Sequence, residues 1–189
     1  MLIDLIKANR SYRRFDGSHP VSRAEVLDLL ESCRFVASST NKQPFKFYIS
    51  CEPETNSSIF SLLKFAALLK DWNGPEENER PTAYVVICAD TGVVKVPDRF
   101  DCGVIAQTLL LGCAERGLGG CMVGNFNREK LKDTLGLVPQ LDPYIVIAIG
   151  KPNETVLLED CSDSTNYYRD SEGRHHVPKR LLKQLLINS

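Results

Sequence analysis

Apolar residues recur along this chain with two different periods, and each period predicts a different kind of element. Leu2, Leu5 and Ile6 share helical spacing, which predicts a helix that ends near Arg10. Strict alternation, or an unbroken run of β-branched residues, instead predicts a strand. We therefore expect helices at residues 2–10, 22–33, 59–69, 99–116 and 127–135, a last helix from residue 178, and strands at residues 45–50, 84–89 and 144–150.

Local signals define several of these boundaries. Ser22 with Glu25 three positions later forms a capping box, and Asn127 is a favoured N-cap. Gly117 suits a helix end because glycine tolerates positive φ, and Pro178 suits a first helical position. The 99–116 helix is apolar nearly all round, so we expect it to be buried on most sides.

One long segment has no clear periodicity. Residues 152–177 show little helix or strand patterning, and structureless stretches of this length are uncommon inside compact domains. We expect this segment either to be functional or to lie against something outside the core, with a partner subunit as a reasonable candidate.

Length and charge restrict the class of protein. The 189 residues favour a single domain spanning 1–189, and 43% of them are hydrophobic. Because 23 Lys and Arg side chains balance 24 Asp and Glu side chains, nothing indicates a nucleic-acid or acidic-membrane partner recognised through bulk charge. Asp4 lies in the apolar N-terminus, which is unlike a signal peptide, and no apolar run approaches the roughly 20 residues of a membrane span. We expect a soluble, cytoplasmic protein.

The cysteines support the same compartment. Their number is odd, their spacing is irregular, and several lie in apolar runs, which is typical of reduced, buried thiols and not of a disulfide framework. They are Cys33, Cys51, Cys88, Cys102, Cys113, Cys121 and Cys161.

Two clusters could bind an anion and a heterocycle. Arg10, Arg13 and Arg14 follow a helix closely, together with Ser11, and arginines bind phosphate through paired donors. A solvated basic helix end would have the same composition. Residues 38–44 combine small hydroxyl and amide side chains, which supply donors and acceptors for a flavin pyrimidine or a nucleobase edge. A turn ending at proline explains this pattern equally well.

Two further segments have weaker signals. The glycines of residues 117–124 would let a planar ligand approach the backbone, or simply end a helix. Lys179 and Arg180 lie at the start of the expected last helix, where cations are unfavourable and a bound anion is welcome. Adjacent His175 and His176 without a third ligand at a standard spacing predict no metal site.

Taken in order along the chain, these segments resemble the nitroreductase family. The resemblance rests on the N-terminal Arg10-Ser-x-Arg13, the loop Ser38-Ser-x-Asn41-x-Gln43-Pro44, the helix from Asp101 leading into residues 117–124, the strand end at Ala148–Pro152, and the basic pair near the C-terminus. The chain departs from many members in having Ala37 in place of proline and Phe45 in place of tryptophan, and it is shorter than the long members.

The resemblance implies an α+β fold with a mostly antiparallel sheet flanked by helices. It also implies an intertwined homodimer with FMN at its interface, residues 152–177 being an arm around the partner. The enzyme would pass two electrons from NAD(P)H to a nitroaromatic or quinone-like acceptor in a ping-pong cycle, with the chemistry on flavin N5 and no catalytic side chain. A non-catalytic flavin-binding protein is the alternative. The FMN ligands would be Arg10, Ser11, Arg13, Ser38, Ser39, Asn41, Gln43, Met122, Val123, Gly124, Lys179 and Arg180. Trp72 either walls the substrate or packs half-exposed.

Overall fold

A computed structural model describes residues 1–161 and 163–188 of the chain. Its helices are α1 (Leu2–Ala8), α2 (Arg23–Cys33), α3 (Pro53–Ser61), α4 (Arg99–Glu115) and α5 (Arg128–Thr134). Its strands are β1 (Phe45–Ser50), β2 (Ala83–Asp90), β3 (Gly119–Val123), β4 (Leu141–Gly150), β5 (Val156–Asp160), β6 (Tyr168–Arg169) and β7 (His175–Lys179). Short 3-10 turns η1 (Ser39–Asn41), η2 (Glu77–Glu79) and η3 (Leu182–Gln184) complete the order.

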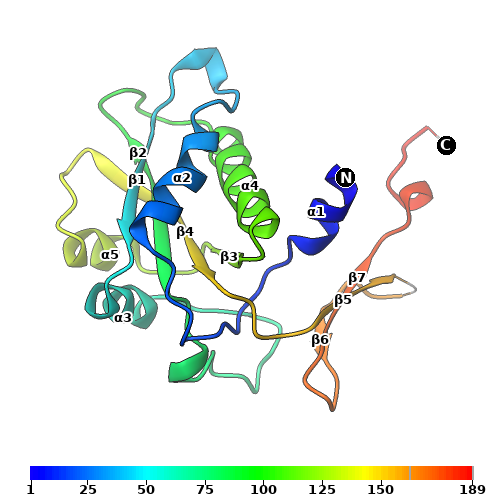
Figure 1. The fold of residues 1–189 in the computed structure, drawn as a ribbon. Helices are drawn as coiled ribbons and strands as arrows, with labels where there is room; N and C mark the ends of the chain where they lie inside the picture. The colour runs from blue at the N-terminus through cyan, green and yellow to red at the C-terminus, as the bar shows by residue number, and fades with distance from the viewer. Residues whose placement is uncertain (162, 189) are drawn as a thin grey trace.

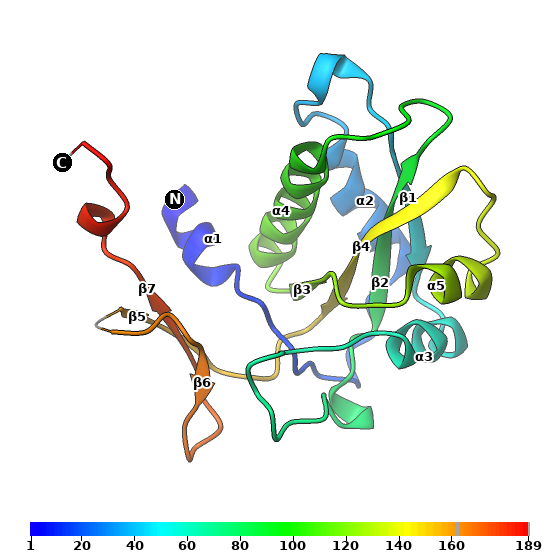
Figure 2. The ribbon, with the colours of Figure 1, turned by 180° about the vertical axis from the view of Figure 1, so that it is seen from behind.

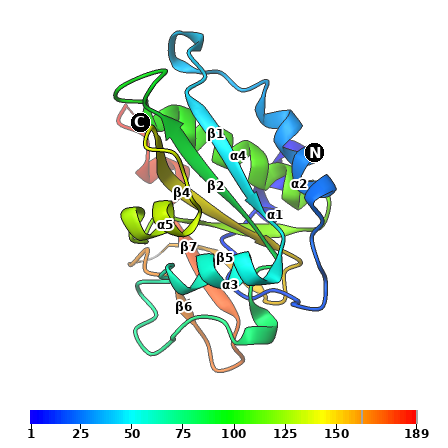
Figure 3. The ribbon, with the colours of Figure 1, turned by 90° about the vertical axis from the view of Figure 1, so that its left-hand side faces the viewer.

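The central sheet has four strands in the order β1-β2-β4-β3, and every neighbouring pair is antiparallel. Helices α2 and α4 cover one face, and α3 and α5 cover the other (Figures 1 and 3). Successive residues of β2 alternate between the two faces, so Val85 packs on the α2–α4 side while Val86 packs on the α3–α5 side. Because both faces are covered, β2 is a continuous apolar run, and the expected α+β class with a mostly antiparallel sheet is confirmed.

Local chemistry determines the ends of α2 and α4. The Ser22 hydroxyl accepts from the Glu25 backbone N–H at 3.2 Å, and the Glu25 carboxylate accepts in return from Ser22, as the capping box predicts. Gly117 has a φ of +66° just past α4, and the Leu118 N–H donates to the Cys113 carbonyl at 2.9 Å. That bond satisfies an end carbonyl of the helix in the way glycine-terminated helices commonly do.

The segment after β4 forms an arm, which we define as residues 152–188. In it, β7 pairs in parallel with β5 and antiparallel with β6, giving the order β5-β7-β6. Figures 1 and 2 show this small sheet beside α1, away from the central sheet. The expectation of irregular structure over 152–177 was therefore wrong for β5, β6 and the start of β7, because these strands are too short to show a period.

Three other expectations fail for identifiable reasons. Pro178 belongs to β7 and opens no helix; it lies past the residues that pair with β6, so its missing N–H interrupts no bond to that strand. Helix α3 ends at Ser61, because Leu63 instead forms a bridge with Phe126. In the single chain, α4 leaves Val104 44% exposed, so it is not buried on most sides.

All seven cysteines are in the described part of the chain and have free thiols. Within residues 1–161 and 163–188, no helix is long and apolar enough to cross a membrane. The same residues contain no group of three or more His, Cys, Asp or Glu side chains that could hold a metal ion.

Candidate functional site

A cavity of about 400 Å³ lies where the N-terminal segment, α4, β3 and the arm meet. Its walls bring together residues from four distant parts of the chain: Asn9, Arg10, Ser11, Arg13, Gln107, Leu110, Met122, Tyr167, His175, Val177 and Lys179. Three cationic side chains therefore face one small space that also offers a hydroxyl. The chemistry of this lining suits an anionic group, because guanidinium and ammonium groups donate charge-assisted hydrogen bonds.

Glycines on β3 allow the arginine segment to approach it closely. Ser11 forms a bridge with Gly120, and the Tyr12 N–H donates to the Gly120 carbonyl at 3.0 Å. A Cβ on Gly119 would lie 2.4 Å from Cδ2 of Tyr12, so only glycine fits there. Residues 119–123 are thus an edge strand, and their glycines serve this contact as well as following the end of α4.

The arginines of the cavity are held by the protein itself. Arg10 donates from Nη2 to the Ile6 carbonyl at 2.5 Å, and burial lowers the pKa of its guanidinium. Arg13 donates from Nη1 to the Ser11 carbonyl at 3.1 Å, and its guanidinium lies 5.0 Å from the centre of the Tyr167 ring. Because Arg13 is oriented before any ligand arrives, less conformational freedom is lost on binding.

His175 has a defined protonation state beside Arg13. Its side chain is 1% exposed, and its Nε2 lies 3.2 Å from Nη1 of Arg13. Arginine has no acceptor, so Nε2 must accept and the ring proton resides on Nδ1. Burial first, and then the charges of Arg13 and Arg169, lower the pKa of His175 to about 4. Its Nδ1 is buried and has no partner among the described residues, which leaves a neutral donor in the cavity wall.

A buried carboxylate joins the arm to the arginine segment. Glu154, whose side chain is 2% exposed, accepts from the backbone N–H groups of Arg13 and Arg14 and from Nη2 of Arg169 at 3.0 Å. The Arg169 guanidinium also covers the Trp72 ring at 4.3 Å. Glu154 therefore sets the position of β7, and with it His175 and Lys179, relative to Arg13.

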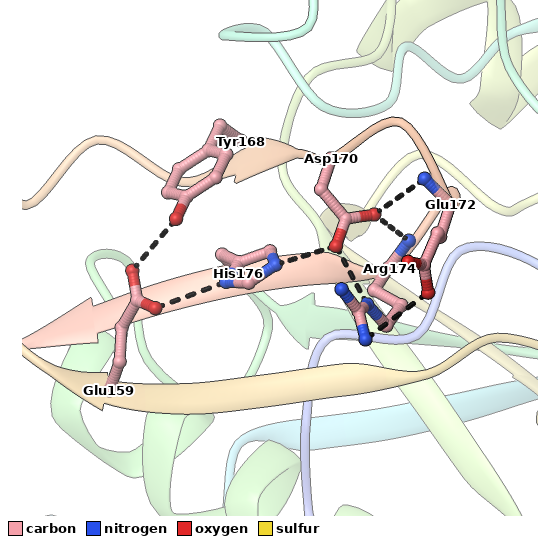
Figure 4. A network of polar contacts seen from close by, with 6 residues as sticks. All are labelled: Glu159, Tyr168, Asp170, Glu172, Arg174 and His176. Atoms are coloured by element: carbon pink, nitrogen blue, oxygen red, sulfur yellow. Dashed lines mark hydrogen bonds and ion pairs between the residues drawn. The ribbon is translucent and has the colours of Figure 1, made fainter.

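A second network stiffens the arm itself (Figure 4). His176 bonds Glu159 through Nδ1 at 3.0 Å and Asp170 through Nε2 at 3.1 Å, and its ring stacks on Tyr168 at 4.6 Å. These two carboxylates raise the pKa of His176, whereas the hydrogen bonds from His176 and Arg174 lower the pKa of Asp170. The His176 ring thus ties β5 and the β6–β7 turn to β7.

The loop predicted to meet a heterocycle lies elsewhere on the chain, at the start of α4. The Ser38 hydroxyl donates to Asp101 at 2.6 Å, and the Ser39 N–H donates to the same carboxylate at 2.9 and 3.0 Å. Asn41 and Gln43 have positive φ angles of 54° and 48°. Residues other than glycine rarely adopt such angles, and those that do are often found at functional sites. Their amides pair with each other at 3.0 Å and are exposed.

The structure thus places the predicted residues in two groups. Arg10, Ser11, Arg13, Met122 and Lys179 line one cavity. The residues that do not line it are Ser38, Ser39, Asn41, Gln43, Val123, Gly124, Arg180 and Trp72. Glu154 and Tyr167 lie in the arm, where no local periodicity indicated a role for them, and His175 was considered only as a metal ligand. The role of Asp101 in holding the loop depends on contacts across more than 60 residues that no local pattern contains.

The sequence model of the Nitroreductase family matches residues 6–151, which is more than half of the chain. The chain belongs to the nitroreductase family. The match includes the arginine segment, the Ser38–Gln43 loop, α4 and the central sheet, and it ends where the arm of this chain begins.

Individual relatives agree with the family match. YdgI of Bacillus subtilis strain 168, provisionally named an NAD(P)H nitroreductase, is 24% identical over 182 aligned positions, which cover 79% of this chain and 87% of YdgI. A nitroreductase family protein from Streptococcus pneumoniae TIGR4 superposes with a TM-score of 0.69 at 16% identity, covering 87% of this chain and 96% of that one. A nitroreductase-like protein from Exiguobacterium sibiricum 255-15, solved in complex with FMN, superposes with a TM-score of 0.68 at 18% identity, covering 82% and 89%.

Proposed function

We propose that this nitroreductase family member is an FMN-dependent oxidoreductase that uses NAD(P)H. The observation that supports this most is the cavity lined by three cations and the Ser11 hydroxyl, assembled from segments that are distant in sequence. The FMN complex of a structural relative and the name of YdgI favour the same cofactor and the same electron donor.

The residues of the cavity fit an FMN phosphate. A phosphate monoester has nearly two negative charges and three acceptor oxygens, and Arg10, Arg13 and Lys179 would offset that charge. The unpaired Nδ1–H of His175 would gain an acceptor without adding a further cation. Met122, 37% exposed on β3, offers an apolar surface for the ring system.

A second copy of the chain would complete this site. Ser38, Ser39, Asn41 and Gln43 do not line the cavity, because Asp101 holds their loop at the first turn of α4, well before Gln107 and Leu110. Apolar residues are exposed over α1, α4 and the C-terminal segment; they include Leu2, Ile6, Phe100, Val104, Leu182 and Leu185. We infer that these faces pair in a homodimer in which the loop of one subunit contacts the flavin held by the other.

The protein's contribution is binding and electrostatics. When bound, FMN would supply the redox chemistry, namely two-electron transfer from a reduced nicotinamide to an electron-poor acceptor such as a nitroaromatic or a quinone. Arg10 and Arg13 would hold the phosphate, and the amides of Asn41 and Gln43 would bond the pyrimidine edge. Among the described residues the cavity contains no carboxylic acid, so protons would come from water.

The phosphate assignment is tested by comparing the affinities of FMN and riboflavin. Arg13→Gln should weaken FMN binding at least tenfold, because a charged hydrogen bond contributes about 1.5–3 kcal/mol, and should leave riboflavin binding nearly unchanged. Arg34→Gln, on the exposed end of α2, is the matched control and should alter neither affinity. Equal losses for both ligands in Arg13→Gln would contradict a phosphate at this position.

The subunit interface is tested by one matched pair of variants. Val104→Glu would place a charge on the exposed face of α4, and we expect light scattering to show monomers with weakened FMN binding. Val138→Glu changes a valine of similar exposure, 47% against 44%, beside α5 on the opposite face of the sheet, and should stay dimeric. A fully dimeric Val104→Glu protein would exclude this interface.

A further inference from the structure

A second cavity lies apart from the first. Its volume is about 270 Å³, and it is lined by the N-terminal segment, the start of α3 and the residues that lead into β2. It shares no lining residue with the cavity that contains Arg13. Apolar groups form much of its wall, with Pro20, Pro53, Pro81 and Phe60 among them.

Two donors in this wall lack partners. Tyr84 is fully buried, and its hydroxyl has no hydrogen-bond partner in the described part of the chain. Burial raises the pKa of Tyr84, and nearby Arg80 opposes this only in part, so the phenol keeps its proton. Arg80 lies 4.4 Å over the Phe60 ring; its Nε is buried and unpaired, and it forms no ion pair with residues 1–161 or 163–188.

The remaining buried amide of the wall is already satisfied. Asn56 donates from Nδ2 to the Thr82 carbonyl at 2.8 Å and accepts from the Ser50 hydroxyl at 2.7 Å. The unused groups are therefore a phenol O–H and a guanidinium, and both require an acceptor. Since buried polar groups in native proteins are nearly always paired, a ligand with a negatively charged acceptor would complete the wall.

Charge and volume restrict that ligand further. The cavity is lined by one cation, Arg80, and by the exposed carboxylate of Glu77, so a doubly charged phosphate would be poorly compensated. We propose that this cavity is a second ligand site that binds a small monocarboxylate, with its carboxylate between Arg80 and Tyr84 and its apolar part against the prolines. The site is independent of flavin binding and of the proposed oxidoreductase activity.

The test uses isobutyrate as the probe and neutral isobutyramide, which has nearly the same shape, as its control. In ¹H–¹⁵N NMR titrations of the whole protein, millimolar isobutyrate should shift the backbone amide signals of the non-proline residues in 51–60 and 80–84, and isobutyramide should not. Shifts confined to the Arg13 cavity, equal shifts with both compounds, or no shifts would each overturn the proposal.

Two variants separate binding from folding. Arg80→Gln should weaken the binding of isobutyrate at least tenfold, because it removes a charge-assisted hydrogen bond. Arg23 is an exposed arginine outside the cavity wall, so Arg23→Gln should leave the isobutyrate affinity unchanged. Tyr84→Phe should weaken the binding of isobutyrate several-fold. It should not lower the melting temperature of the unliganded protein, because the hydroxyl that it removes is unpaired. A lower melting temperature would mean that the hydroxyl already has a partner and would overturn the assignment. Unchanged isobutyrate affinity in Arg80→Gln would do the same.

Discussion

Removing the Glu154 carboxylate should release the arm. Glu154→Ala would leave the Arg169 guanidinium, whose side chain is 13% exposed, without its ion pair, and would leave the N–H groups of Arg13 and Arg14 without their acceptor. Breaking a buried ion pair by deleting one partner costs about 3–5 kcal/mol. Since about 1.4 kcal/mol is a factor of ten in an equilibrium, opening of the arm should become at least about a hundredfold more favourable.

Native-state hydrogen exchange measures this opening directly. The His175 N–H donates to the Thr155 carbonyl at 2.8 Å and the Cys161 N–H to the Lys179 carbonyl at 2.7 Å, so both report on the pairing of the arm. Asp28→Ala removes an exposed ion pair with Arg116 and should change little, as surface pairs contribute about 0–1 kcal/mol. If the exchange rates at His175 and Cys161 rise no more in Glu154→Ala than in Asp28→Ala, the anchoring role of Glu154 is refuted.

Three further predictions concern the same region. His175 should be neutral at pH 6, with its proton on Nδ1, and ¹⁵N chemical shifts of the ring would report this. Because folding lowers its pKa from 6.5 to about 4, the free energy of unfolding should decrease as the pH falls from 6.5 towards 4. A ring that is charged at pH 6 would contradict this prediction. His176 should titrate above its ordinary pKa of 6.5, and Asp170 should titrate below its ordinary pKa of 3.8. The strands of the arm should therefore pair most stably between pH 3.8 and pH 6.5, and less stably at lower and at higher pH. An NMR titration midpoint at or below 6.5 for His176 would exclude the network. Gly119→Ala should displace Tyr12 and weaken FMN binding, because the added Cβ would lie 2.4 Å from Cδ2 of Tyr12, and an unchanged FMN affinity would count against the close approach.

Local rules predicted what local contacts determine. The strand Phe45–Ser50, the Ser22 capping box and the glycine after α4 follow from interactions within a few residues, and the structure has all three. The strand β3 was missed because its glycines have low strand propensity, and only the packing of Tyr12 and Leu110 against it explains them.

The site depended on contacts that no local pattern contains. Glu154 bonds Arg13 across 141 residues, and His175 meets Arg13 across 162. Pairings of this kind arise when β7 docks, so the sequence alone indicated the basic residues but neither their buried carboxylate nor their neutral histidine. Lys179 was predicted for a helix N-terminus and is found at the end of a strand, yet it lines the same cavity as the arginines.

The central claim is that this nitroreductase family member binds FMN and is reduced by a nicotinamide. The most direct test is the absorbance spectrum of the purified, desalted protein, followed by anaerobic addition of NADPH and then NADH. We predict flavin absorbance that bleaches with at least one donor and returns when a quinone is added. Flavin absorbance that neither donor bleaches would leave a flavin-binding protein without reductase activity. A colourless protein that takes up no added FMN would contradict the account.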